Sequence, residues 1–266
     1  EQAGWFAQTF SGLADNIEHA IIGKRHVVEL VLTAMISEGH VLLEDVPGTG
    51  KTSLARALAQ SVQGTTTRIQ FTPDLLPGDV TGITVYDQKT GEFEFHAGPV
   101  FAMIVLADEI NRASPKTQSA LLEVMSEGRV TIDGVSRSVG TPFLVIATQN
   151  PVEQAGTYRL PEAQLDRFLL RTSLGYPDRA STVQILAGTA VQQHDLSPVI
   201  TPQALAGMSG LAREVYVNAM VYDYIARLVE ATRDAEQVRL GSSIRGGLAL
   251  TRAAKTRAAL QGRTYV

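Results

Sequence analysis

Apolar positions recur at helical spacing through the first forty residues of the chain. Leu13, Ile17 and Ile21 keep one face apolar, and the same spacing resumes from Val27 to Met35. Apolar residues three or four positions apart line one face of a helix. The pattern therefore predicts helical structure over residues 13–38, with a break in the middle.

Three short apolar runs predict strands that are buried on both faces. They are Val41–Leu43, Ala102–Ala107 and Phe143–Ala147. Continuous apolar runs of this kind are typical of parallel sheets covered by helices. Helical patterns at Thr52–Val62 and Thr117–Met125 follow two of these runs. Strands that alternate with helices predict an α/β fold with a parallel central sheet flanked by helices.

Two further stretches alternate apolar and polar residues around a turn, and each predicts a β-hairpin. Residues 83–86 and 93–95 flank a polar turn over residues 87–91. Residues 129–132 and 135–139 flank Asp133-Gly134, a dipeptide that favours the tightest hairpin turns.

The pattern changes near residue 176, beyond which only helical periods are found. The predicted helices are Val183–Ala190, Pro202–Ala212, Ala219–Arg233 and Ile244–Leu260. We therefore expect an α/β core over residues 1–176 and a small all-helical domain over residues 177–266.

Composition narrows the possible functions. Hydrophobic residues make up 44% and charged residues 19%, which is the balance of a folded protein. No cysteine is present, so disulfides and thiolate metal sites are excluded. The net charge of −4 makes nucleic acid an unlikely main partner, because nucleic-acid binding depends on neutralising phosphates. No apolar stretch approaches the length of a membrane span, and we expect a cytoplasmic protein.

A glycine-containing loop between the first predicted strand and its helix points to phosphate binding. Glycine lets the backbone turn its N–H groups toward an anion, and the helix that follows presents its positive end. Lys51 would add a charge against the phosphates, and Thr52 a hydroxyl ligand for Mg²⁺. The alternative is an ordinary glycine-rich turn, which the strand before it and the helix after it disfavour. The residues that we expect to contact the nucleotide here are Val46, Pro47, Gly48, Thr49, Gly50, Lys51, Thr52 and Ser53.

Asp45 departs from the usual pattern, which has glycine at this position. Aspartate tolerates a turn better than most residues do. Because a second anion would repel phosphates, we expect the Asp45 carboxylate to point away from them.

Two adjacent carboxylates, Asp108 and Glu109, end the second predicted strand. Asp108 is a candidate ligand for Mg²⁺, and Glu109 is a candidate to polarise the attacking water. Taken alone, such a pair is often a solvated loop. Asn150 ends the next predicted strand and could orient the water or contact a phosphate, although an asparagine before proline is also a common turn.

Four segments in order carry a family resemblance. They are Glu44–Thr52, Ala107–Ala113, Ala147–Pro151 and Leu160–Phe168. Together they resemble the MoxR family of AAA+ ATPases, and the resemblance covers nearly the whole chain. Asp45 is itself typical of that family.

The resemblance implies a Mg²⁺-dependent ATPase with an AAA+ core and a small helical lid, which we expect to be incomplete at its C-terminal end. Asp108 and Glu109 match the Walker B pair and Asn150 matches sensor 1. Arg167 matches an arginine finger that reaches a neighbouring subunit's ATP, and Arg245 resembles sensor 2. Ile22-Gly23 resembles the segment beside adenine.

Alternatives stay open for both arginines. Arg167 could form a surface ion pair, which stabilises little, and Arg171 is a nearby rival for the finger role. Arg245 lies at a predicted helix start, where a cation gains nothing from the helix dipole, so a ligand-facing role competes with a solvated one.

The implied function is chaperone-like remodelling or maturation of partner proteins, including metal or cofactor insertion. The implied assembly is a hexameric ring that works with a von Willebrand factor A domain protein and a client enzyme. A nucleotide-dependent switch or scaffold is the main alternative. A nucleic-acid motor is a weaker one that rests on Arg129 and Arg137 of the second hairpin.

Overall fold

A computed structural model describes residues 2–151, 156–188 and 196–266. At its centre is a five-stranded sheet in the order β2-β5-β8-β1-β9, in which every described pair is parallel. Its strands are β1 (Val41–Glu44), β2 (Thr66–Gln70), β5 (Ile104–Asp108), β8 (Leu144–Gln149) and β9 (Leu170–Thr172). The predicted α/β fold with a parallel central sheet is confirmed.

Helices cover both faces of this sheet, because successive strand residues point to opposite sides. Leu43, Leu106 and Ile146 share one hydrophobic cluster with the helices α1 to α3. Their neighbours Leu42 and Val105 belong to a second cluster with α5. The helices that precede or connect the strands are α1 (Gln2–Glu18), α2 (Arg25–Ile36), α3 (Lys51–Ser61), α4 (Pro77–Thr81), η1 (Ile110–Arg112), α5 (Pro115–Glu127) and α6 (Glu162–Leu165).

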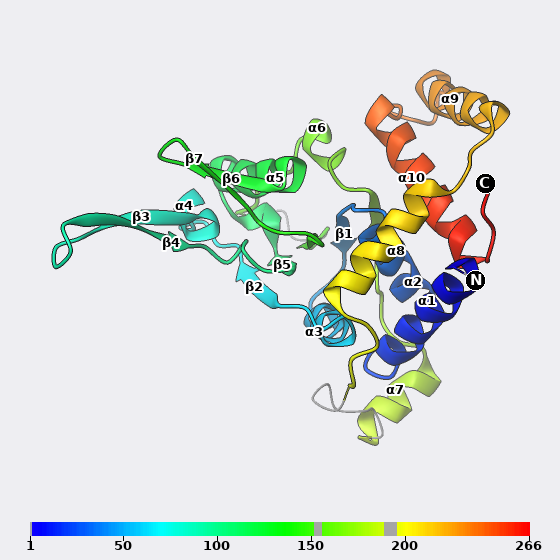
Figure 1. Cartoon of the computed structure of the whole chain (residues 1–266), viewed down its shortest axis with the longest axis horizontal. Helices are drawn as coiled ribbons and strands as arrows, with labels where there is room; N and C mark the ends of the chain where they lie inside the picture. The colour runs from blue at the N-terminus through cyan, green and yellow to red at the C-terminus, as the bar shows by residue number, and fades with distance from the viewer. Residues whose placement is uncertain (1, 152–155, 189–195) are drawn as a thin grey trace.

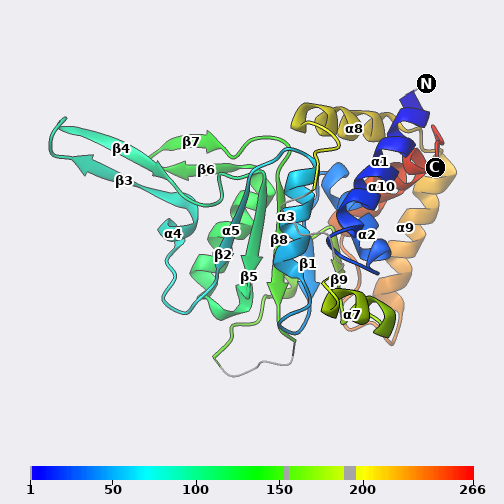
Figure 2. The same cartoon turned by 90° about the horizontal axis from the view of Figure 1, so that it is seen from below.

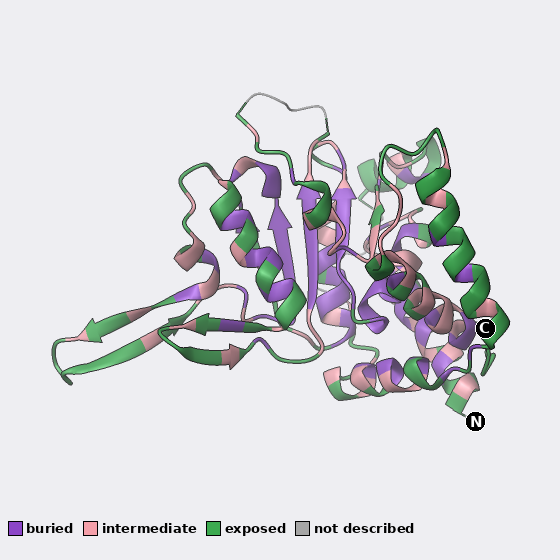
Figure 3. Ribbon diagram, turned by 90° about the horizontal axis from the view of Figure 1, so that it is seen from above, coloured by how far each residue is buried: buried purple, intermediate pink, exposed green. Residues whose placement is uncertain are grey.

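Two β-hairpins extend from the sheet on the side away from the C-terminal helices (Figure 1). One joins β3 (Gly82–Asp87) to β4 (Glu92–Ala97), and the other joins β6 (Arg129–Ile132) to β7 (Val135–Ser138). Both were predicted. The first forms a long, largely exposed arm, whereas the central strands are buried (Figure 3).

The C-terminal part of the described chain is helical, as the sequence predicts. It contains α7 (Arg179–Leu186), α8 (Pro202–Glu214), α9 (Ala219–Asp234) and α10 (Ile244–Leu260). A polar residue caps the start of each helix by accepting a backbone N–H. These caps are Asp178, Thr201, Asn218 and Ser243. Residues 189 and 190, the end of the predicted helix Val183–Ala190, lie outside the described residues.

The first two helices pack against the C-terminal ones at one end of the molecule (Figure 2). Phe6 and Phe10 of α1 share the first hydrophobic cluster with Leu205 of α8 and Ala258 of α10. The division at residue 176 stays a prediction.

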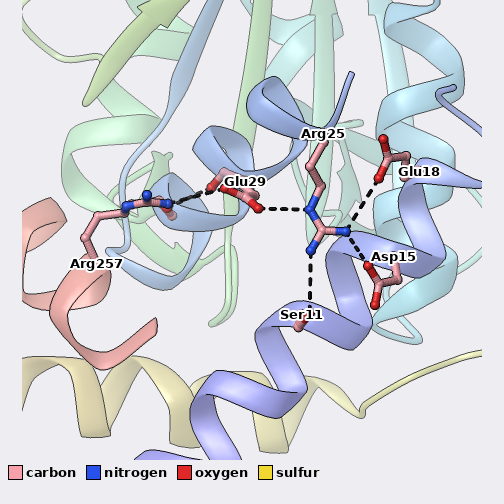
Figure 4. A network of polar contacts seen from close by, with 7 residues as sticks. Ser11, Asp15, Glu18, Arg25, Glu29 and Arg257 are labelled. Atoms are coloured by element: carbon pink, nitrogen blue, oxygen red, sulfur yellow. Dashed lines mark hydrogen bonds and ion pairs between the residues drawn. The ribbon is translucent and has the colours of Figure 1, made fainter. Parts of the chain in front are cut away.

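An arginine-centred network reinforces this end of the molecule (Figure 4). Arg25 of α2 pairs with Asp15 and Glu18 of α1 and, at 2.9 Å, with Glu29 of its own helix. Glu29 also lies 3.5 Å from the guanidinium of Arg257 on α10. The hydrogen bond to Glu29, followed by the bond to Asp15, raises the pKa of Arg25 above its ordinary value against the opposing effect of burial. The network therefore ties α1, α2 and α10 together through ion pairs.

Several elements differ from the prediction, including the short helices α4, η1 and α6, which were not predicted. The first helix begins at Gln2 rather than near residue 13, and it buries Phe6 and Phe10. The strands β2 and β9 were not predicted. β2 has only one neighbour in the sheet and four of its five residues retain exposure, so its sequence lacks an apolar run. β9 has only three residues, which is too short to give an alternating pattern.

Candidate nucleotide site

The predicted phosphate loop joins β1 to α3. Gly48 and Gly50 have φ values of 84° and 94°, a region that residues with a side chain adopt only with strain. A Cβ atom at either position would meet nothing within 4 Å. These glycines are therefore required by the turn itself and not by a shortage of space.

The loop and two strand ends enclose a cavity of about 220 Å³. The structure thus brings the loop together with both predicted carboxylates. Val46 lies beside the cavity, where its carbonyl accepts a 3.5 Å hydrogen bond from the Thr49 hydroxyl. The cavity is lined by Pro47, Gly48, Thr49, Gly50, Lys51, Thr52, Ser53, Arg68, Gln70, Asp108 and Glu109.

The start of α3 gives this cavity an anion-binding wall. Gly50 is the cap residue, and it has no side chain with which to satisfy the first N–H groups of the helix. Such unpaired N–H groups carry the positive end of the helix dipole. The ammonium group of Lys51 adds a full charge at the same place, which suits a polyphosphate.

Both oxygens of the Asp108 carboxylate have partners. Oδ1 accepts a 2.5 Å hydrogen bond from the Thr148 hydroxyl. Oδ2 accepts from both Nη2 and Nε of Arg68, at 2.6 and 3.2 Å. The carboxylate is thus held at the end of β5 by the strands on either side of it.

Glu109 lies directly after β5 in the left-handed backbone region, with φ 55°. Its N–H donates to the Thr148 hydroxyl at 2.9 Å. Its carboxylate accepts from the Gln70 amide at 3.0 Å and from Arg112 at 3.1 Å. The backbone turn therefore directs Glu109 into the cavity, where two donors fix its orientation.

Sequence reasoning missed Arg68, Gln70 and Thr148. The first two lie on β2, a strand whose polar sequence gave no signal. Thr148 lies within Ala147–Pro151, a segment that carried the family resemblance. It is the penultimate residue of β8, the strand next to β5, so its position could have indicated a contact with Asp108.

The residues of the cavity fit a nucleotide with its metal ion. Backbone N–H groups and Lys51 suit phosphate oxygens, while the Thr52 hydroxyl and the Asp108 carboxylate supply the oxygen ligands that Mg²⁺ prefers. Asn150 follows the last residue of β8, at the same edge of the sheet.

Ile22 and Gly23 lie between α1 and α2, and Gly23 packs against α7. A Cβ atom at Gly23 would lie 2.4 Å from the Ser181 hydroxyl. The neighbouring Lys24 ammonium donates to the carbonyl of Tyr176 at 2.7 Å. Ile22-Gly23, the segment that resembles the adenine-contacting one, therefore lies against the part of the chain that leads into the C-terminal helices.

Asp45 is buried and turns its carboxylate toward the chain that follows β9. It accepts hydrogen bonds from the N–H groups of Leu174, at 2.6 Å, and Gly175, at 2.8 Å. The prediction that this carboxylate points away from the phosphates is confirmed, since it is not among the residues that line the cavity.

Arg167 and Arg245 lie elsewhere. They line a second cavity of about 220 Å³, together with Glu38 to His40, which precede β1. The phosphate loop follows β1, so the two cavities lie at opposite ends of this strand. Arg167 donates to the carbonyl of Leu122 and to the hydroxyl of Ser126, at 2.7 and 2.8 Å.

The carboxylate of Asp166, the residue before Arg167, connects this part of the chain to the start of α10. It accepts from the Ser243 hydroxyl at 2.8 Å and lies 3.8 Å from the Arg245 guanidinium. The structure therefore brings Arg167 and Arg245 together with each other, and it does not bring either into the phosphate-loop cavity.

The rival arginine lies near the first cavity. Arg171 pairs with Glu44, the residue that ends β1, and Glu44 also accepts from the Gln149 amide. Arg171 is thus engaged at the phosphate-loop end of the sheet, unlike Arg167.

His40 forms part of the wall of the second cavity. Its Nδ1 accepts from the N–H of Val145 and its Nε2 pairs with the carbonyl of Met125, both at 3.0 Å. Burial lowers the pKa of His40 to about 4, because a charged imidazole would lose its hydration. The ring is therefore neutral at physiological pH.

A parallel sheet that brings a glycine loop and an acidic strand end into one cavity defines a P-loop nucleotide-binding protein. Comparison with known proteins specifies the class. A family model described as "ATPase family associated with various cellular activities (AAA)" matches residues 40–170, and one for the AAA lid domain matches residues 230–266.

Relatives extend over nearly the whole chain. The uncharacterised protein YeaC of Bacillus subtilis is 49% identical over 95% of this chain and 79% of its own length. The chaperone MoxR1 of Mycobacterium tuberculosis is 43% identical over 94% of this chain and 69% of its own. A crystal structure from Cytophaga hutchinsonii has a TM-score of 0.90 at 37% identity, covering 100% of this chain and 84% of that one.

The chain belongs to the MoxR family of AAA+ ATPases. It hydrolyses ATP, and its chaperone relatives support a nucleotide-dependent, chaperone-like activity. Within the described residues, no helix is both long and apolar enough to cross a membrane.

Proposed function

We propose that this protein is a ring-forming, Mg²⁺-dependent ATPase that remodels or matures partner proteins. The proposal rests on the separation of two groups of predicted site residues along β1. The phosphate loop, Asp108 and Glu109 lie at one end of β1, while Arg167 and Arg245 lie at the other end.

This separation requires a second copy if the arginines act on nucleotide. β1 has four residues, and a strand rises about 3.3 Å per residue, so the two ends are about 13 Å apart. An arginine at the far end would reach a neighbour's ATP rather than its own. Arg171 lies at the phosphate-loop end, so we favour Arg167 as the finger.

Within one copy, each residue of the nucleotide site has a separate role. Lys51 and the loop N–H groups bind and orient the phosphates. Thr52 and Asp108 would hold Mg²⁺, which would neutralise charge on the phosphates. Glu109 polarises the attacking water or accepts its proton, and Asn150 orients that water. Ile22 and Gly23 would contact the base.

The proposed assembly and partners rest on the family resemblance. A hexameric ring in the cytoplasm, a von Willebrand factor A domain protein as co-partner and a client enzyme are all consistent with the chaperone relatives. Insertion of a metal or cofactor into that client is the finer form of the proposal. The exposed arm formed by β3 and β4 offers a surface for such partners, since Phe93 and Ile83 are largely solvent-accessible.

Local contacts disfavour a nucleic-acid motor. Arg129 donates to the hydroxyl and carbonyl of Ser136. The Arg137 guanidinium stacks 4.0 Å above the ring of Phe95, on the neighbouring hairpin. Both arginines are thus committed to contacts within the chain, and neither projects freely toward phosphates.

An ATP-trapped variant tests the proposal and separates it from a nucleotide switch. Glu109→Gln should retain ATP binding, block hydrolysis and hold its client in a stable complex, which a pull-down with ATP would recover. Lys51→Ala is the control, because it should recover the client neither with ATP nor without it. A switch would instead keep full biological function in Glu109→Gln. Full function of this variant in a deletion strain would therefore contradict the remodelling mechanism.

A further inference from the structure

The metal-ligand candidate Asp108 has a cationic partner within the chain, Arg68. Arg68 places two N–H donors on Oδ2, while Thr148 donates to Oδ1. A carboxylate oxygen that accepts two N–H bonds has its lone pairs engaged. Mg²⁺ cannot approach that oxygen, directly or through its water, unless the guanidinium moves.

We propose that Arg68 is an internal cation that competes with Mg²⁺ for Asp108 and is displaced when the metal–nucleotide complex binds. This inference rests on the assignment of Asp108 as the metal carboxylate in the proposed function. Arg68 is here a positioning residue, because it acts through the carboxylates of the site.

The exposure of the two partners favours such an exchange. The side chain of Asp108 is only 11% exposed, whereas that of Arg68 is 51% exposed. The carboxylate is thus fixed in the site, and the guanidinium is free to swing into solvent or toward the phosphates. Without Arg68, Asp108 would lose its ion pair while lying next to a second carboxylate, Glu109, and like charges at close range are unfavourable. Arg68 removes that repulsion until the metal arrives.

Displacement of Arg68 would also affect Glu109. The Nη2 atom of Arg68 donates to the Gln70 carbonyl oxygen at 2.8 Å, and the Gln70 amide nitrogen donates to Glu109 at 3.0 Å. Arg68 therefore fixes which end of the Gln70 amide faces Glu109. Once Arg68 leaves, the Gln70 amide is no longer held in that orientation, so its hydrogen bond to Glu109 is less constrained. Metal binding at Asp108 is thereby linked to the freedom of Glu109 through Arg68 and Gln70.

Direct metal binding tests the inference without turnover. Mn²⁺, which takes the same oxygen ligands as Mg²⁺, would be titrated into the nucleotide-free protein and the free ion followed by electron paramagnetic resonance. Arg68→Ala should bind Mn²⁺ more tightly than wild type by about threefold to tenfold, because exposed or partly exposed ion pairs are of modest strength. If Arg68→Ala does not fold, Arg68→Gln removes the charge and keeps a polar side chain.

Arg213→Ala is the matched control. Arg213 pairs with Glu38 at 2.6 Å, the same distance as Arg68 to Asp108, and is 62% exposed, but it lies outside the cavity. Its loss should leave Mn²⁺ affinity unchanged.

Asp108→Asn separates the two possible failures. If Asp108→Asn abolishes Mn²⁺ binding while Arg68→Ala binds as wild type or more weakly, the role of Arg68 is overturned. If Asp108→Asn binds Mn²⁺ like wild type, the metal assignment itself is wrong.

Discussion

The two ends of the central sheet carry different sets of charged side chains. At the carboxyl end, Asp108 and Glu109 each have an arginine partner, and the glycine loop turns unpaired N–H groups into the cavity. At the other end, three arginines line one cavity with two carboxylates and a neutral histidine: Arg167, Arg245, Arg252, Glu38, Asp166 and His40. The first end is built to receive an anion and a cation together, and the second has an excess of positive charge.

This difference explains why the fold alone does not complete the site. A parallel sheet places its ligand-binding loops at the carboxyl ends of the strands. Residues that precede a strand, as Arg167 precedes β9, lie at the other end and face outward. Such a residue acts on a nucleotide only when another copy brings its own phosphate loop to it.

Removing Arg167 should cause the largest change. Arginine fingers contribute about 10³–10⁵ in rate. Arg167→Ala should therefore lose at least about 10³ in turnover, measured as steady-state phosphate release, while titration with a fluorescent nucleotide shows unchanged affinity. Arg171→Ala is the matched comparison and should lose far less. The reverse order would assign the finger to Arg171.

Mixed assemblies test whether Arg167 acts between copies. Glu109→Gln subunits keep an intact Arg167, and Arg167→Ala subunits keep an intact Glu109. If the finger acts on a neighbour, mixing two inactive variants should regenerate some complete sites and restore measurable hydrolysis. Absence of any restoration, with mixed assembly verified by mass spectrometry, would argue against sharing.

Removing Lys51 should cause the next largest change, at the opposite end of the sheet. A hydrogen bond to a charged group contributes about 1.5–3 kcal/mol, so Lys51→Ala should weaken nucleotide binding by about 10- to 100-fold. Calorimetric titration with ATP measures this directly. Lys89→Ala, in the exposed turn of the first hairpin, controls for loss of a positive charge. ATP affinity at the wild-type level in Lys51→Ala would refute the site assignment.

His40 predicts a pH dependence that belongs only to the arginine end. Its folded pKa of about 4 lies below the ordinary value of 6.5, so the unfolded chain binds more protons between these values. Stability is then complete above about pH 6.5 and falls as the pH drops toward 4. At about 1.4 kcal/mol per pH unit, His40 should cost about 2 kcal/mol between pH 6.5 and 5.

Chemical denaturation of wild type and His40→Gln at the two pH values isolates this contribution. Glutamine keeps both a donor and an acceptor but does not titrate. The free energy of unfolding of the variant should therefore fall less on acidification than that of wild type. Equal losses in the two proteins would show that His40 is accessible to protons in the folded state.

Much of this architecture could be predicted from the sequence, for reasons visible in particular residues. The run ending at Asp108 is buried on both faces, so its apolar residues identify a central strand. The edge strand β2 could not be predicted in this way, because only one side of it is paired. Arg68 and Gln70 were missed with it, although they contact both predicted carboxylates.

Closeness in the sequence does not show that two arginines lie at the same end of the sheet. Arg167 and Arg171 are four residues apart, yet β9 carries them to different ends of the sheet, one beside Ser126 and one beside Glu44. Sequence proximity made them rivals for one role. Arg167 precedes β9 whereas Arg171 lies within it, and this strand is too short to be predicted.

Substitution of Asp45 should cause the smallest of the predicted changes. Its carboxylate faces the N–H groups of Leu174 and Gly175, so it fixes the chain leaving β9 to the start of the phosphate loop. Asp45→Asn keeps one acceptor oxygen and should lower stability by about 1 kcal/mol, the worth of one hydrogen bond. Because the carboxylate does not face the phosphates, ATP affinity should change less than about threefold.

Thermal unfolding and an ATP titration on the same Asp45→Asn protein check both parts. Thr49→Ser, which alters the loop but leaves the contact with Leu174 intact, is the comparison. A large loss of ATP affinity in Asp45→Asn, at unchanged stability, would mean that the loop geometry depends on this anchor. The residue that departs from the usual glycine would then shape the anion site itself, and not only the connection to the C-terminal helices.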